Sequence, residues 1–286
     1  MKLTQTPRGI LLEDADGLSL EDTFTCGQCF RWETGEASSF HGVAFGRYLK
    51  IIQHPDGSLL FEGMDEKEFL SVWFPYFDLG RDYALIRREL SLRDPQLAAA
   101  CRNAPGIRIL RQEPWEALCS FIISQNNNIP RIKGIIERFC HCFGQSAGGG
   151  LASFPPPDVV AGLTVEDLAP LRCGFRAKYL LDAADKVASG KIHLEELVRA
   201  PIEEARASLM TILGVGPKVA ECALLYGMGR MDAFPMDVWM KRAMALLFPG
   251  RTPEFFSPYA GIAQQYLFHY CRQNKILTAE DARRAV

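Results

Sequence analysis

Hydrophobic and polar residues alternate over the first 62 positions in short stretches separated by turn-forming residues. Alternation with a period of two is typical of strands that are buried on one face. Residues 54–57 read His-Pro-Asp-Gly, a sequence that favours a hairpin turn. The pattern therefore predicts an antiparallel sheet with strands near residues 10–12, 30–33, 40–45, 48–53 and 59–61.

The spacing of hydrophobic residues becomes helical from Asp65 onward, and nearly every segment after residue 105 reads as helix. In the helix expected after Pro130, four apolar residues share one face: Ile132, Ile135, Ile136 and Phe139. Other helices are expected near residues 69–74, 83–90, 95–101, 115–123, 180–187 and 202–213. Three glycines at 148–150 and three prolines at 155–157 predict a loop that divides the helical part in two.

These elements predict an α+β fold with two domains. Residues 1–105 are expected to form an N-terminal antiparallel sheet domain with flanking helices. Residues 106–286 are expected to form a mostly helical core in two parts, completed by parts of the N-terminal helices. A chain of 286 residues with 48% hydrophobic content is long enough to bury such cores.

A helical hairpin is expected at residues 213–218. Gly214 and Gly216 give the backbone freedom that a tight turn needs, and Pro217 suits the first position of the following helix. Lys218 then lies in the first turn, where the helix dipole repels a cation by about 0.3 to 1 kcal/mol and burial adds a desolvation penalty. Both effects favour the neutral, nucleophilic amine, although a solvated lysine on a helix end is the commoner interpretation of such a pattern.

Asp237 follows Pro235 and precedes an apolar run at 238–248 with helical periodicity. Aspartate is a preferred helix N-cap, and that structural role alone would explain it. The order of hairpin, lysine and later aspartate resembles the helix-hairpin-helix DNA glycosylase superfamily. The resemblance gives Asp237 a second, chemical role.

Four further segments are similar to the 8-oxoguanine DNA glycosylase family: CGQCFRW at 26–32, SQNNNIPRIKG at 124–134, GFRAKY at 174–179 and AGIAQQYLF at 260–268. The resemblance implies a DNA repair enzyme that flips 8-oxoguanine, paired with cytosine, out of duplex DNA. It implies that Lys218 displaces the base through a Schiff base and that β-elimination then nicks the strand. The Asp237 carboxylate would stabilise positive charge on the sugar, although a carboxylate beside the amine also opposes its activation.

The resemblance also assigns the base pocket. The Gly27 carbonyl would accept the N7–H that only the oxidised base carries. Cys222 and Phe268 would lie on the two faces of the base, and Gln264 would read its Watson–Crick edge. Each of these last three side chains, taken singly, is more often ordinary core.

The remaining implied contacts are with the DNA duplex. Asn126, Arg131 and Arg176 would read the orphaned cytosine, and Phe175 would fill the gap beside the evicted nucleotide. Backbone N–H groups at Gly214 and Gly216 would approach a phosphate. Trp239 stands where eukaryotic members have a histidine, and Phe175 where they commonly have tyrosine, so the phosphate contact of that histidine would be absent or replaced.

The charge balance limits how DNA could be bound. A net charge of −2 and a pI near 6.2 argue against coating nucleic acid by bulk electrostatics, so DNA contacts must be local. Candidate cations are Arg131, Lys133, Arg138, Arg172, Arg176 and Lys178, each of which also reads as ordinary surface charge.

Two other functions fit the same motifs: a purely DNA-binding helix-hairpin-helix module, and a monofunctional glycosylase for alkylated bases. Lys218 disfavours the second, which does not need the lysine.

Nine cysteines without regular spacing indicate reduced thiols. The CxxC at Cys26 and Cys29 has no partner pair at zinc spacing, and the C-terminal region holds only Cys271, too few for an iron–sulfur cluster. We therefore expect no metal and no required cofactor, with a monovalent cation at the hairpin as an option.

The chain lacks a long apolar stretch and a signal-peptide core, so we expect no membrane contact. We expect an intracellular location, in the cytoplasm or nucleoid, or in the nucleus of a eukaryote. We also expect a monomer.

Overall fold

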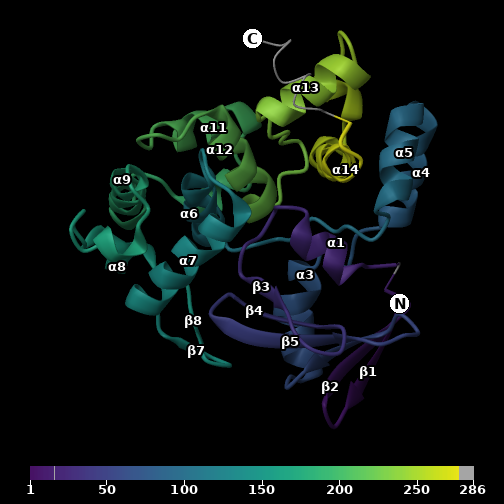
Figure 1. The fold of residues 1–286 in the computed structure, drawn as a ribbon, viewed down its shortest axis with the longest axis horizontal. Coiled ribbons are helices and arrows are strands. Elements are labelled where there is room, and N and C mark those ends of the chain that lie inside the picture. Colours follow the sequence, from purple (N-terminus) through teal and green to yellow (C-terminus); the bar gives the residue numbers. More distant parts are fainter. Residues whose placement is uncertain (16, 277–286) are drawn as a thin grey trace.

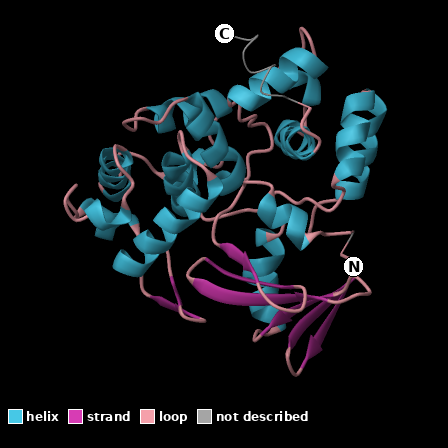
Figure 2. Cartoon of the chain, in the orientation of Figure 1, coloured by secondary structure: helices cyan, strands magenta, loops and turns pink. Residues whose placement is uncertain are grey.

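A computed structural model describes residues 1–15 and 17–276. It shows a six-stranded antiparallel sheet at one end of the molecule and an assembly of helices above it (Figures 1 and 2). The predicted α+β fold is therefore confirmed. Within the described residues, no helix combines the length and hydrophobicity needed to cross a membrane.

The sheet has the strand order β1-β2-β6-β5-β4-β3. Its strands are β1 Lys2–Thr6, β2 Gly9–Glu13, β3 Trp32–Thr34, β4 Ser39–Ala44, β5 Arg47–Gln53 and β6 Leu59–Glu62. Ile51 on β5 pairs with Phe61 on β6, and both are fully buried, as the alternating pattern predicts. The predicted hairpin between these strands is present, since Gly57 has φ +85° and the His54 N–H donates to the Ser58 carbonyl at 2.9 Å.

Two elements of the first 62 residues differ from the prediction. The strand β1 was not expected, because its sequence is mostly polar and it lies at the sheet edge, where it pairs only with β2. A short helix, α1 Leu20–Thr25, was not expected either. Its start is marked by Ser19, whose hydroxyl accepts from the Asp22 N–H at 3.2 Å.

An aromatic core fills the space between the sheet and three short helical segments: α2 Glu66–Glu68, the π-helical turn η1 Phe69–Trp73 and α3 Phe74–Tyr76. Phe24 of α1 stacks on Trp32 with ring centroids 4.3 Å apart. Phe69 meets Phe61 edge to face at 4.9 Å. Such contacts add to the hydrophobic burial of the rings, so the sheet has a core of its own.

The helical part contains α4 Tyr83–Arg93, α5 Pro95–Asn103, α6 Pro114–Ser124, α7 Ile129–Phe143, α8 Pro157–Ala161, η2 Ala169–Leu171, α9 Arg176–Ala188, α10 Leu194–Leu197, α11 Ile202–Met210, α12 Pro217–Cys222, η3 Ala223–Gly227, α13 Val238–Leu247, η4 Pro253–Phe256 and α14 Ala260–Gln273. The helices predicted near residues 83–90, 95–101, 115–123, 130–139, 180–187 and 202–213 are all present. The predicted apolar face of α7 is buried. Helices α4 and α5 pack with the helical core, with α5 beside α14, rather than with the sheet.

The glycine run at 148–150 is not a simple loop, and this corrects the prediction. It is the turn of a small hairpin formed by β7 Ser146–Gly148 and β8 Leu151–Ala152. All three glycines have positive φ, and a Cβ on Gly149 would lie 2.3 Å from the ring of Tyr48 on β5. The hairpin thereby reaches down to the sheet, as Figure 1 shows, and connects the two parts of the molecule.

Candidate active site

The helices α11 and α12 are joined by a hairpin, as predicted. Gly214 has φ +75°, and a Cβ there would lie 2.4 Å from the ring of Tyr179 on α9, so a larger residue would not fit. Gly216 caps α12, and Pro217 occupies its first position. Lys218 is therefore in the first turn of α12, at the positive end of the helix dipole.

The side chain of Lys218 turns toward α6 instead of extending into solvent. Its Nζ donates to Ser124 Oγ at 3.4 Å and lies 5.2 Å from the centroid of the Phe121 ring. The residue is half-buried. Neither neighbour was singled out from the sequence as a site residue, although Ser124 is the first residue of the segment SQNNNIPRIKG.

Asp237 is the N-cap of α13, as predicted. Its carboxylate accepts from the Met240 N–H at 2.7 Å. Between these two described residues, Lys218 and Asp237, there is no ion pair, but both charges act on the Cys222 thiol. Lys218 and Asp237 thus lie close enough to the same buried thiol to influence it, and the capping bond holds the carboxylate in place.

Cys222 lies one turn after Lys218 on α12, and its side chain is buried. Burial raises the pKa of this thiol to about 11, and the Lys218 charge lowers it only in part. Cys222 is therefore a neutral thiol at physiological pH. A neutral, polarisable sulfur can pack on the face of a base but cannot act as a nucleophile there.

Gly27, between α1 and β3, lies against α14 from the C-terminal part of the chain. A Cβ placed on Gly27 would lie 3.8 Å from Cε1 of Phe268 on α14, and Gly27 has φ +90°. The Arg272 guanidinium lies 5.7 Å from the centroid of the Phe268 ring. The structure thus brings together two of the residues predicted to contact the base.

Gln264 precedes Phe268 by one helical turn on α14. Its Nε2 donates to the Pro235 carbonyl at 3.3 Å, while its Oε1 is buried and has no hydrogen-bond partner within the described part of the chain. A buried acceptor without a partner costs about 1 to 3 kcal/mol. A ligand that donates a hydrogen bond at this position would remove that penalty.

The loop between α6 and α7 carries Asn126, which is exposed and has φ +46°. The first turn of α7 carries Arg131, which is also exposed and whose Nη2 donates to the Arg172 carbonyl at 3.4 Å. These two predicted readers of the opposite base are therefore both accessible at the surface. The loop and helix that carry them follow Ser124, the last residue of α6 and the hydrogen-bond partner of Lys218.

Arg176 is placed differently from the other two predicted readers. It is buried, and its guanidinium donates to the Asn126 carbonyl at 3.0 Å, the Cys173 carbonyl at 3.1 Å and the Gln125 carbonyl at 3.0 Å. Its role as a base reader stays a prediction. These bonds indicate that Arg176 also fixes the shape of the loop that presents Asn126.

Two large hydrophobic side chains near these residues are exposed. Phe175 caps α9 and is 47% exposed, with Tyr179 packed edge to face against it at 5.6 Å. Trp239 in the first turn of α13 is 46% exposed. Trp239 and Phe268 line one small cavity between α13 and α14, so the predicted phosphate-contact position adjoins the predicted base pocket.

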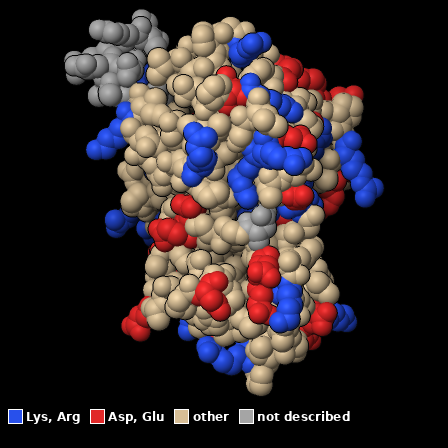
Figure 3. Space-filling view, turned by 90° about the vertical axis from the view of Figure 1, so that its right-hand side faces the viewer, with Lys and Arg blue, Asp and Glu red and all other residues tan. Residues whose placement is uncertain are grey.

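The other candidate cations divide into two groups. Lys133 donates to the Trp32 carbonyl at 2.7 Å, and Arg138 donates to the Leu171 carbonyl at 2.7 Å, so both help to hold the fold. Arg172 and Lys178 are exposed. Figure 3 shows one face of the molecule, on which basic and acidic side chains are interspersed, in agreement with a low net charge.

Cys26 and Cys29 are both buried. Burial raises the pKa of Cys26 to about 12 and that of Cys29 well above its usual value. The Cys26 Sγ donates to the Thr23 carbonyl at 3.2 Å. Among the described residues, no group of three or more His, Cys, Asp or Glu side chains surrounds a possible metal position.

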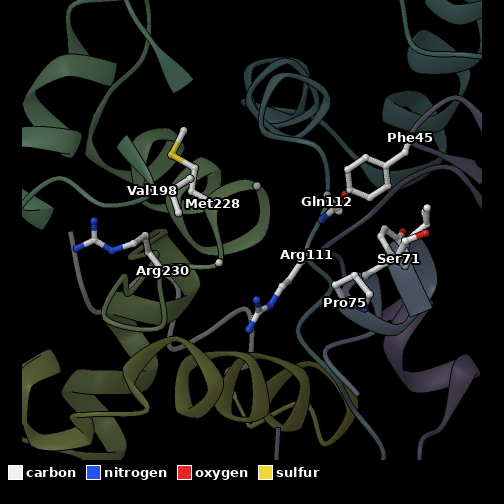
Figure 4. A pocket seen from close by; sticks show the side chains of 12 residues that line it. Phe45, Ser71, Pro75, Arg111, Gln112, Val198, Met228 and Arg230 are labelled. Atoms are coloured by element: carbon white, nitrogen blue, oxygen red, sulfur yellow. The ribbon is translucent and has the colours of Figure 1, made fainter. Parts of the chain in front are cut away.

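A cavity of about 470 Å³ lies between the sheet and the helical part (Figure 4). Phe45 and Pro75 line it from the sheet side, and Met228 and Val198 line it from the helical side. None of the predicted site residues lines this cavity. Its relation to them is indirect, because Gly227 at its wall ends η3, the continuation of the helix that carries Lys218.

Comparisons with known proteins cover most of the chain. Residues 10–118 match the model of the 8-oxoguanine DNA glycosylase N-terminal domain, and residues 119–254 match that of the HhH-GPD superfamily base excision DNA repair proteins. The N-glycosylase/DNA lyase OGG1 of Arabidopsis thaliana is 30% identical over 279 residues, which cover 88% of this chain and 76% of the relative.

Two solved structures are similar over nearly the whole chain. MBOgg1 in complex with a low-affinity DNA ligand has 44% identity and a TM-score of 0.90, covering 96% of this chain and 100% of that one. The Clostridium acetobutylicum 8-oxoguanine glycosylase/lyase, bound to duplex DNA with cytosine opposite 8-oxoguanine, has 37% identity and a TM-score of 0.89, covering 96% and 99%. The chain belongs to the 8-oxoguanine DNA glycosylase family.

Proposed function

We propose that this chain excises 8-oxoguanine opposite cytosine from duplex DNA and then nicks the strand, with Lys218 as the nucleophile. The observation that carries the proposal is the position of the amine. Lys218 Nζ lies at a helix N-terminus, bonded to a neutral hydroxyl and over an aromatic ring. An amine held in this position, half-buried and beside Ser124, is placed to attack the sugar of an extruded nucleotide.

The chemistry follows from that amine. Its lone pair attacks C1′ of the extruded nucleotide, the C1′–N9 bond breaks, and the base leaves with the bonding electrons and takes up a proton. The amine loses its protons as the sugar ring opens, which gives an imine between Nζ and C1′. Removal of a proton from C2′ then expels the 3′ phosphate, and the strand is cut.

Asp237 supports the first of these steps. Loss of the base builds positive charge on the sugar, and a carboxylate already held by its bond to the Met240 N–H stabilises that charge without reorganising. In the free protein the carboxylate does not pair with Lys218, and each group has its own hydrogen-bond partner. The two roles of Asp237, helix cap and electrostatic stabiliser, are therefore compatible.

Recognition of the base takes place where Gly27 lies against α14. The Gly27 carbonyl accepts N7–H of 8-oxoguanine and repels the N7 lone pair of guanine. Phe268 covers one face of the base and the Cys222 thiol the other. The unpartnered Gln264 Oε1 accepts from the N1–H and N2–H groups of the Watson–Crick edge, which satisfies the buried acceptor.

Duplex contacts use the exposed residues of the helical part. Phe175 fills the gap left by the extruded nucleotide. Arg131 donates to the orphaned cytosine, and Asn126 both donates to it and accepts from it. The N–H groups at Gly214 and Gly216 bind a phosphate at the start of α12. Trp239 takes the place of the family's histidine and packs against the DNA backbone through its exposed indole.

The protein works as a monomer on double-stranded DNA and without a required cofactor, because the lysine amine supplies the nucleophile. A monovalent cation at the hairpin stays a prediction. Since its substrate is DNA, the enzyme belongs where the chromosome is, in the nucleoid of a prokaryote or the nucleus of a eukaryote.

Duplexes containing 8-oxoguanine, a methylated purine or only normal bases test the proposal, each incubated with and without borohydride. Release of 8-oxoguanine with a trapped protein–DNA adduct is the expected result. Release of methylated purines without an adduct would support the monofunctional alternative, and binding without release of any base would support the DNA-binding module.

A further inference from the structure

Discrimination by a backbone carbonyl requires that the carbonyl point in one direction. Gly27 has φ +90° and no Cβ, and glycine is the residue with the greatest backbone freedom. Gly27 has no side chain that could fix the orientation of its peptide group. The structure must therefore hold Gly27 through the residues on either side.

The residue that follows Gly27 is held firmly. Gln28 is fully buried, and its Nε2 donates to the Arg108 carbonyl at 2.7 Å while its Oε1 accepts from the Leu110 N–H at 2.9 Å. The Gln28 carbonyl accepts from Gln112 Nε2 at 2.7 Å. The C-terminal side of the Gly27 peptide group is thus anchored to the segment that connects α5 and α6.

The residue that precedes Gly27 is held by a side chain from the other end of the chain. Gln265 Nε2 donates to the Cys26 carbonyl at 3.3 Å, and this carbonyl belongs to the peptide group that joins Cys26 to Gly27. The Oε1 of Gln265 accepts from the Tyr226 hydroxyl at 2.6 Å. Gln265 is 1% exposed, so water does not compete for these bonds.

Tyr226 lies on η3, the continuation of the helix that carries Lys218. Its ring stacks on Phe121 with centroids 5.2 Å apart and planes inclined by 21°, and Phe121 is the ring beside Lys218 Nζ. Burial raises the pKa of Tyr226 well above its usual value, so its hydroxyl remains a hydrogen-bond donor. One ring pair therefore connects the nucleophile to the glutamine that holds the Gly27 peptide group.

We propose that Tyr226 and Gln265 are positioning residues that set the specificity of the enzyme, by holding the Cys26–Gly27 peptide group so that the Gly27 carbonyl faces N7 of the base. The inference rests on the proposed function. The adjacent glutamines on α14 have different roles. Gln264 keeps a free acceptor for the base, whereas the oxygen and the nitrogen of the Gln265 amide both form hydrogen bonds within the protein.

The variants Tyr226→Phe and Gln265→Met test this inference, since each keeps the shape of the buried side chain and removes its polar atoms. The matched control is Tyr266→Phe, which removes a buried hydroxyl on α14 whose partners are the Ile107 carbonyl at 3.4 Å and the Arg87 side chain, not the Gly27 loop. For each protein, kcat/KM is measured on 8-oxoguanine and on guanine, with strand cleavage at a preformed abasic site and the thermal midpoint as further readouts.

The ratio of kcat/KM for 8-oxoguanine to that for guanine is expected to fall about tenfold in both test variants and to stay unchanged in Tyr266→Phe. Cleavage at the abasic site is expected to stay within twofold of the unsubstituted protein, because that substrate has no base to read. An unchanged ratio, or an equal fall in the control, would overturn the inference. If the unsubstituted protein releases no 8-oxoguanine, the proposed function itself fails, and the inference falls with it.

Discussion

Lys218 and Asp237 both act on the Cys222 thiol, yet they do not form an ion pair with each other. The amine donates to Ser124 Oγ, and the carboxylate accepts from the Met240 N–H. A direct ion pair would stabilise the charged amine and oppose its attack on the sugar. The separate partners of the two groups avoid that penalty.

The two roles assigned to Asp237 can be separated by two substitutions. Asp237→Asn keeps a capping oxygen and removes the charge, so we expect the unfolding free energy to change by a few tenths of a kcal/mol while kcat for base release falls at least tenfold. Asp237→Ala removes both and is expected to lose about 1 kcal/mol of stability as well. Thermal unfolding and single-turnover base release measure the two effects, and full activity of Asp237→Asn would limit the residue to capping.

Phe175 is expected to act only when DNA is bound, because its ring is 47% exposed in the free protein. Phe175→Ala should leave the thermal midpoint almost unchanged and reduce base extrusion about tenfold, which a fluorescent base analogue placed beside the lesion reports. Phe45→Ala is the control, since Phe45 is 40% exposed and lies at the β4–β5 turn. Equal extrusion by both variants would contradict the assignment.

Gly27→Ala should reduce the preference for 8-oxoguanine over guanine. A residue with a side chain at φ +90° is strained, by about 1 to 2 kcal/mol on the scale of left-handed helical residues, and relief of the strain rotates the carbonyl. Gly57→Ala carries a comparable strain at φ +85° with open space around it, in the hairpin far from the site. The ratio of kcat/KM for 8-oxoguanine to that for guanine should fall in Gly27→Ala only. An equal ratio in both variants would contradict the role of the Gly27 carbonyl in recognising the base.

The cysteines should respond to pH as buried thiols. Cys142 is exposed and the other eight are buried, so at pH 8 a disulfide reagent should titrate one thiol per native chain and nine after unfolding. Burial raises the pKa of Cys222 from 9.0 to about 11, so the native chain binds more protons than the unfolded chain between these values. Stability should therefore decrease as pH rises through this window, and fast labelling of Cys222 at pH 8 would contradict its burial.

The sequence predicted those features that depend on local patterns. Apolar periodicity located the helix α7 and its buried face. Gly214, Gly216 and Pro217 located the hairpin, because Gly214 has the positive φ that glycine favours and Pro217 suits the first helical position. The strand β1 was missed for the opposite reason. Its polar residues carry no alternating pattern, and the strand conformation is stabilised by backbone pairing with β2.

Features that depend on tertiary contacts could not be predicted. The GFRAKY segment gives no sign that Arg176 is buried against the carbonyls of another loop. The contact of Ser124 with Lys218 and the bond from Tyr226 to Gln265 join segments that are far apart in the sequence. Only the folded chain brings these pairs together.

The central claim is that the Lys218 amine is the nucleophile, and borohydride trapping on a duplex with 8-oxoguanine opposite cytosine tests it most directly. Lys191→Gln, which removes an exposed lysine paired with Asp185, serves as the control. The unsubstituted protein and the control are predicted to form a covalent adduct, whereas Lys218→Gln forms none although it still binds the duplex. An adduct that persists in Lys218→Gln would contradict the account.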